Sequence, residues 1–304
     1  MKTKFTLFSL LVLAALLLSA CGGGNAPAGG GKLQVLATTS IVADVVRQVG
    51  GEYVQVTTLL PLGTDPHTFE PRPQDAAAIA EAQIVFANGA GLEEFLEPLL
   101  ESAGATDKLV EVSSGIELLP FAGEEHDHEG GDPHTWMDPN NVLVWVDNIA
   151  AALAAADPEH AAAYQANAEA YAADLRALDG WIREQVAHVP PENRYLVSDH
   201  AVFGYFAHRY GFTQVGTITG SFSSGASPSA QELAALEDQI RAFGVRAVFV
   251  GADVNPNLAQ QIAADTGIRL VPLYHGSLTE TDGPAPTYLE FMRYNVNAIV
   301  AALK

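Results

Sequence analysis

Cysteine is nearly absent from this sequence of 304 residues, in which Cys21 is the only example. A lone thiol excludes an internal disulfide framework and a metal site built from several thiolates. Basic residues are also scarce, because 15 Lys and Arg stand against 36 Asp and Glu and give a formal net charge of −21. Nucleic-acid binding needs a basic surface, so the composition argues strongly against nucleic acid as a partner.

The N-terminus has the layout of a secretory signal. Lys2 and Lys4 precede an apolar run over residues 5–18, and small residues then lead to Cys21. The run is too short for a membrane-spanning helix, which needs about 20 apolar residues. The sequence Leu-Ser-Ala-Cys at 18–21 also resembles the lipobox of bacterial lipoproteins, whose cysteine is lipidated. We expect a signal peptide over residues 1–20 and a lipid anchor at Cys21, with a plain signal peptide as the alternative.

The segment 22–31 is rich in glycine and predicts a flexible tether. A Gly-rich chain of this length has a root-mean-square reach of roughly 17 Å. The leader carries two lysines and no acidic residue, so the chain without it has a formal net charge of −23. Residues 32–304 suffice for two domains of ordinary size, each with its own core.

Short apolar runs alternate with helical patterns in both halves of the remaining chain. This order predicts an α/β fold, with parallel sheets covered by helices on both faces. The predicted strands are Leu33–Ala37, Tyr53–Leu60, Ile84–Ala87, Arg194–Val197, Gln214–Thr217, Ala247–Val250 and Arg269–Pro272. The predicted helices are Ser40–Val49, Pro73–Ala82, Leu92–Ala103, Ala201–Tyr210, Ala230–Phe243, Pro256–Thr266 and Thr287–Leu303.

Residues 140–189 lack any strand pattern and are rich in alanine. Asp138-Pro139 and Asp157-Pro158 both have the form of an N-cap followed by proline at the first helical position. From Pro158 to Ala187 the chain predicts one helix, roughly 45 Å long at 1.5 Å per residue. We therefore expect an N-terminal lobe over 32–157, a linking helix over 158–189 and a C-terminal lobe over 190–304, with little hinge opening between the lobes.

Four of the nine histidines lie just after predicted strands or before helix starts, where α/β folds place ligand sites. These are His67, His134, His200 and His275. Neutral imidazole is a good ligand for zinc and other late first-row metals. Single loop histidines are more often ordinary surface or core residues, so position alone leaves a metal site and a structural role about equally supported.

Two of these histidines occur in the sequence Asp-Pro-His, at 65–67 and 132–134. Asp65 and Asp132 are therefore candidates to fix the tautomer of a ligand histidine from behind. His126 and His128 lie in a short, acidic, Gly-rich loop. This loop is either an auxiliary site that collects metal weakly or simply a solvated charged segment.

Several long motifs together resemble the substrate-binding lipoproteins of zinc and manganese ABC importers, over essentially the whole chain after the leader. The motifs are LLPLGTDPHTFEPRPQD, DPHTWMDPNNVLVWVDNIAAAL, DHAVFGYFAHRYGF, SGASPSAQELAALEDQI and TYLEFMRYNV. The resemblance implies two Rossmann-like lobes joined by a long helix, with a metal in the cleft between them. It implies His67 and His134 as ligands from the first lobe and His200 from the second. It also implies a monomer that serves an importer permease with its ATPase.

The chain departs from this family at two places. Gly276 stands where relatives often have a ligand aspartate, and Gly251 stands where they often have glutamate. The candidates for the fourth ligand are therefore His275, water, and the carboxylates of Glu70 and Asp253. A site rich in imidazole favours zinc, with manganese as the alternative, because manganese prefers oxygen ligands.

Other function classes receive less support from the sequence. A zinc hydrolase with three histidines and an open water position would need a general base, and the chain has neither an H-E-x-x-H motif nor a G-x-S-x-G elbow. A surface adhesin is another alternative, and the metal ligands make adhesion at most a secondary role. A metal-sensing or metal-buffering lipoprotein without a transporter is a further alternative, which the sequence does not separate from an importer component. We therefore expect no enzymatic activity.

Overall fold

The computed structural model describes residues 31–120, 131–221, 225, 227–252 and 254–304. Leu33–Lys304 form one compact unit. The expected signal peptide, Cys21, His126, His128, Asp253 and nearly all of the tether lie outside the described residues. Among the described residues, no helix combines the length and the apolar character needed to cross a membrane.

The first lobe is built on a parallel sheet with the strand order β2-β1-β3-β4. Its side chains are buried on both faces in the central strands, which explains why those strands appear in the sequence as continuous apolar runs. Its strands are β1 (Leu33–Ala37), β2 (Val54–Thr58), β3 (Ile84–Ala87) and β4 (Leu109–Glu111). Its helices are α2 (Ser40–Gly50), α3 (Pro73–Glu81) and α4 (Leu96–Ala103).

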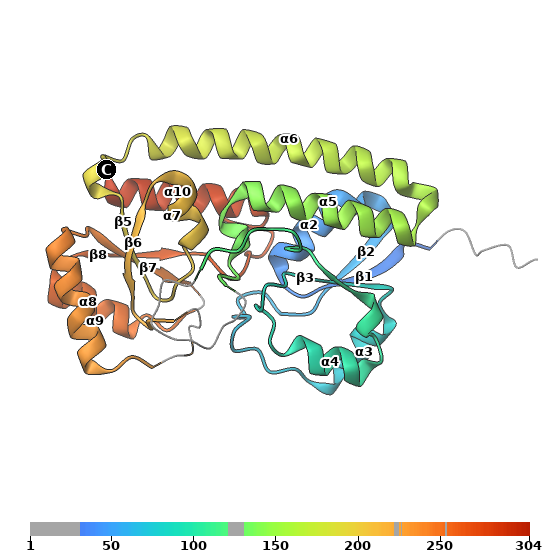
Figure 1. Cartoon of the computed structure of the whole chain (residues 1–304), viewed down its shortest axis with the longest axis horizontal. Helices are drawn as coiled ribbons and strands as arrows, with labels where there is room; N and C mark the ends of the chain where they lie inside the picture. Colours follow the sequence, from blue (N-terminus) through green and yellow to red (C-terminus); the bar gives the residue numbers. More distant parts are fainter. Residues whose placement is uncertain (1–30, 121–130, 222–224, 226, 253) are drawn as a thin grey trace, which may run out of the picture. The chain divides into compact units, whose positions relative to one another are not determined.

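The second lobe repeats this plan, with a parallel sheet in the order β6-β5-β7-β8 (Figure 1). Its strands are β5 (Tyr195–Ser198), β6 (Thr213–Thr217), β7 (Ala247–Gly251) and β8 (Arg269–Leu273). Its helices are α7 (Gly204–Tyr210), α8 (Ala230–Phe243), α9 (Asn257–Thr266) and α10 (Tyr288–Leu303). The α/β class and the two parallel sheets expected from the sequence are therefore confirmed.

Two long helices lie between the sheets in sequence, α5 (Pro139–Ala156) and α6 (Ala161–Val186). The expectation of one regular helix from Pro158 was too simple, because Pro158–His160 form a 3₁₀ turn. The Asp157 carboxylate accepts hydrogen bonds from the His160 ring at 2.7 Å and from the Tyr164 hydroxyl at 2.7 Å, which ties this turn to the first part of α6. Other 3₁₀ turns lie at Gly51–Tyr53, Thr106–Lys108, Thr135–Met137 and Pro191–Asn193.

Two helices start later than the sequence suggested, because the chain first forms a bonded turn. Before α4, the buried Glu93 carboxylate accepts the backbone N–H groups of Asn88 at 2.8 Å and Gly89 at 3.1 Å. Before α7, the Asp199 carboxylate accepts the N–H of His200 at 2.8 Å. In both cases these hydrogen bonds keep the residues that follow the strand in a loop, and the helix begins only after that loop.

One hydrophobic cluster extends through both lobes and under the long helices. It includes Val35 of β1, Tyr171 of α6 and Phe249 of β7, all buried. The outer face of each sheet has its own smaller cluster, covered by α3 and α4 in the first lobe and by α8 and α9 in the second. The inner faces of the two sheets therefore belong to a single core.

Candidate metal centre

The four histidines selected from the sequence all follow strands at the carboxyl edges of the two sheets. His67 lies in the loop after β2 and His134 in the segment after β4. His200 follows β5 and His275 follows β8. Segments that follow parallel strands emerge at the same edge of a sheet, which is where ligands bind in open α/β folds.

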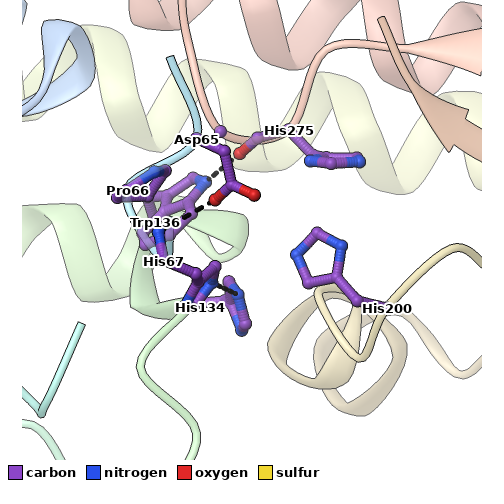
Figure 2. A pocket seen from close by; sticks show the side chains of 8 residues that line it. Asp65, Pro66, His67, His134, Trp136, His200 and His275 are labelled. Atoms are coloured by element: carbon purple, nitrogen blue, oxygen red, sulfur yellow. Dashed lines mark hydrogen bonds between the residues drawn. The ribbon is translucent and has the colours of Figure 1, made fainter. Parts of the chain in front are cut away.

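Three of the histidines converge. The Nε2 atoms of His67 and His134 are 3.1 Å apart. The ring centre of His200 lies 5.6 Å from that of His67 and 5.3 Å from that of His134 (Figure 2). One ring nitrogen from each of the three lies within 4.8 Å of the others. Donor atoms around a tetrahedral zinc are separated by roughly 3.3 Å, given bonds of about 2.0–2.1 Å, so this histidine trio is compatible with a single cation.

The Asp132 carboxylate supports His134 from behind. Its Oδ1 accepts the backbone N–H of His134 at 2.9 Å and lies 2.8 Å from the ring Nδ1. Burial raises the pKa of Asp132 to about 7, and burial lowers the pKa of His134 well below its usual value. The His134 ring is therefore kept neutral, with Nδ1 held by Asp132 and Nε2 directed at His67, as a metal ligand requires.

The other carboxylates selected from the sequence lie in different surroundings. Asp65 accepts the backbone N–H of His67 at 2.9 Å and lines the pocket. Glu70 is exposed and is not among the pocket-lining residues. The lining residues are Asp65, Pro66, His67, His134, Trp136, His200, His275 and Gly276.

Sequence reasoning missed Asp199, which lies between His200 and His275. Its Oδ1 is 3.0 Å from Nδ1 of His200, and its Oδ2 is 3.0 Å from Nε2 of His275. Burial by itself would raise the pKa of the Asp199 carboxyl, but the charges and hydrogen bonds of His275 and His200 hold it well below its usual range. The available signal was its position directly after β5, next to a candidate ligand.

His275 is buried and stands beside the histidine trio rather than within it. Its ring centre is 4.8 Å from that of His200, and its Nε2 faces Asp199. In Figure 2 the His275 ring is seen on the His200 side of the pocket, away from the His67–His134 pair. Its backbone oxygen accepts the indole N–H of Trp136 at 2.8 Å, which connects this loop to the first lobe.

The chain is similar to known metal-binding proteins along most of its length. The family model described as zinc-uptake complex component A, periplasmic, matches residues 35–302. A manganese-binding lipoprotein of Halalkalibacterium halodurans is 35% identical over 305 residues, covering 99% of each chain. An iron-binding protein of Yersinia pestis is 32% identical over 296 residues, covering 96% of this chain and 94% of that one.

Solved structures show the same fold. A manganese-bound periplasmic metal-binding protein from Candidatus Liberibacter asiaticus has a TM-score of 0.79 and 30% identity, covering 90% of this chain and all of that one. The periplasmic zinc-binding protein TroA of Treponema pallidum has a TM-score of 0.81 over 90% of this chain and 99% of that one; at 23% identity it supports the fold alone. The match over residues 35–302 decides the assignment: this chain belongs to the zinc-uptake component A family, the metal-binding substrate-binding proteins of ABC transporters.

Proposed function

We propose that this protein captures zinc outside the cytoplasmic membrane and delivers it to the permease of an ABC importer. The observation that carries this proposal is the histidine trio, in which ring nitrogens of His67, His134 and His200 lie within 4.8 Å of one another. Neutral imidazole serves zinc well in a four-coordinate site, and three protein ligands leave the fourth position open.

Manganese is the second candidate, because manganese-binding lipoproteins of Halalkalibacterium halodurans and Bacillus subtilis are 35% and 32% identical to this chain. Manganese favours carboxylate, carbonyl and water oxygens. Among the described residues, Gly276 lines the pocket and Asp65 is the one carboxylate in its lining. The three ring nitrogens of the histidine trio therefore support zinc over manganese.

The metal preference is measured by titrating the metal-free chain from Lys32 onward with zinc and manganese in competition. We expect zinc to bind at least tenfold more tightly, a difference of about 1.4 kcal/mol. Raw affinities of nitrogen sites follow the Irving–Williams order, so copper, nickel and cobalt should also bind in vitro. Tighter binding of manganese than of zinc would show that manganese, and not zinc, is the metal that this protein captures.

We also propose that Cys21 carries the lipid that anchors the protein, since the relatives include lipoproteins. Stable anchoring takes more than one acyl chain, which a lipidated N-terminal cysteine supplies. Cys21→Ala should therefore give an unlipidated protein that is lost from the membrane fraction. Fractionation and intact-mass measurement check this, and a variant with unchanged mass and membrane partitioning would contradict it. We expect the protein to act as a monomer.

A further inference from the structure

The Asp199 carboxylate accepts hydrogen bonds on every side. Oδ1 receives the backbone N–H of His200 at 2.8 Å and faces its Nδ1 at 3.0 Å. Oδ2 receives the backbone N–H of Gly251 at 2.9 Å and faces Nε2 of His275 at 3.0 Å. Two carboxylate oxygens offer about four lone-pair sites, so this buried group has no acceptor site left for a cation.

These contacts determine which nitrogen each ring presents. Because Nδ1 of His200 donates to Asp199, its Nε2 carries the free lone pair, and His200 belongs to the histidine trio. Because Nε2 of His275 donates to the same carboxylate, its lone pair is on Nδ1, and no ring nitrogen of His275 lies within 4.8 Å of ring nitrogens of both His67 and His134. The two rings therefore have different functions although both are buried beside the pocket.

The same contacts connect the ligands of the two lobes. Trp136, two residues after His134, donates its indole N–H to the His275 backbone oxygen at 2.8 Å. His275 faces Asp199, and Asp199 faces His200. The orientation of the second-lobe ligand is thus tied to the segment that carries a first-lobe ligand.

We propose that Asp199 and His275 are positioning residues for metal capture: His275 completes the hydrogen-bond shell of Asp199, and Asp199 holds His200 with Nε2 toward the metal. This inference rests on the proposed metal function. It assigns three imidazole ligands to the cation and leaves the fourth position open. It also means that Asp199, His200 and His275, whose donor atoms lie close enough to hold an ion themselves, serve as a hydrogen-bonded support.

The test compares His275→Gln with His275→Ala in the chain from Lys32 onward, which contains the whole compact unit. Glutamine places an amide N–H near the position of the histidine Nε2 and can donate to Asp199, but it does not replace an imidazole ligand. We expect His275→Gln to keep zinc affinity within about threefold of the wild type, and His275→Ala to lower it by about tenfold, as for loss of a group behind a ligand. Equal losses in both variants, with both still folded, would overturn the positioning role.

Visible spectra of the cobalt(II)-loaded protein provide a second measurement. Their bands would not change in the variants if Asp199 and His275 had a purely structural role. Cobalt binds such nitrogen sites, and its visible bands report the ligand set directly. His275→Gln should retain the wild-type bands, whereas Asp199→Asn should weaken or shift them, because the amide NH2 group that replaces one carboxylate oxygen cannot accept a hydrogen bond from a ring. Zinc affinity of Asp199→Asn should fall between about tenfold and about 100-fold. Altered bands in His275→Gln, or wild-type bands and affinity in Asp199→Asn, would refute the proposal.

A matched control is available at Asp157, which also contacts a histidine ring, at 2.7 Å, but at the start of α6. Asp157→Asn should leave zinc affinity and the cobalt bands unchanged. Circular dichroism of each metal-free variant establishes that it is folded, and if Asp199→Asn does not fold, the two His275 variants decide the question. A wild-type chain that binds neither zinc nor cobalt would instead refute the proposed function itself.

Discussion

Alanine at His67, His134 or His200 is expected to weaken zinc binding by well over tenfold in each single variant, a loss of more than about 1.4 kcal/mol. Each substitution removes one of three nitrogen donors that lie within 4.8 Å of one another. Calorimetric titration of the metal-free proteins measures the loss. The matched control is His208→Ala, an exposed histidine on α7, which should bind zinc like the wild type.

Zinc binding by the wild type should also weaken in acid, because each imidazole must be neutral to donate its lone pair. Burial already lowers the pKa of His134 well below its usual value, so this ring stays neutral as the pH falls toward 6. Wild-type affinity in all three alanine variants, or zinc binding independent of pH between 5 and 7, would rule out this site.

Gly204→Ala should disrupt the metal centre from a position that never touches the metal. A Cβ atom at Gly204 would lie 2.3 Å from Oδ2 of Asp132, which is too close for a carbon and an oxygen that are not bonded to each other. Asp132 is buried, and its other oxygen holds both the backbone and the ring of His134. The added methyl group must therefore displace either the carboxylate, and His134 with it, or the start of α7.

We expect Gly204→Ala to lose at least tenfold in zinc affinity and to destabilise the metal-free protein by about 1–3 kcal/mol, as for other overpacked sites. Titration and urea unfolding measure the two effects. Gly180→Ala is the control, since Gly180 is an exposed position in α6 whose added Cβ meets nothing within 4 Å. Alanine favours helix by about 1 kcal/mol over glycine, so this variant should be slightly more stable. Wild-type zinc affinity and wild-type stability of Gly204→Ala would contradict this prediction, because they would show that the segment around Asp132 can shift without a loss of free energy.

The sheets were predictable because their central strands are buried on both faces. Ile84–Ala87 reads as an unbroken apolar run and was predicted with its observed bounds. The strand Leu109–Glu111 was missed, because three residues with partly exposed side chains give no recognisable pattern. Helix α7 was predicted to start at Ala201, since nothing local indicates that residues 199–203 form a turn bonded to Asp199.

The histidines could be selected as candidate ligands because imidazole is a recognisable metal ligand when it follows a strand, and because the motifs around them are long. Asp199 was not found, because its role depends on partners distant in sequence: His275 is 76 residues away and Gly251 is 52 residues away. For the same reason the sequence left open whether His275 is a ligand. That question concerns which ring nitrogen faces which neighbour, and only three-dimensional contacts determine it.

The shared strand order of the two sheets makes their loops counterparts of one another. His134 follows β4 and His275 follows β8, so the two occupy the same place in successive copies of one architecture. Yet the His134 ring faces Asp132 through Nδ1, whereas the His275 ring faces Asp199 through Nε2. A half-chain ending before β5 would keep two rings of the trio, and one beginning there would keep a single ring. Duplicating the scaffold therefore cannot duplicate the site, and neither half alone can assemble it.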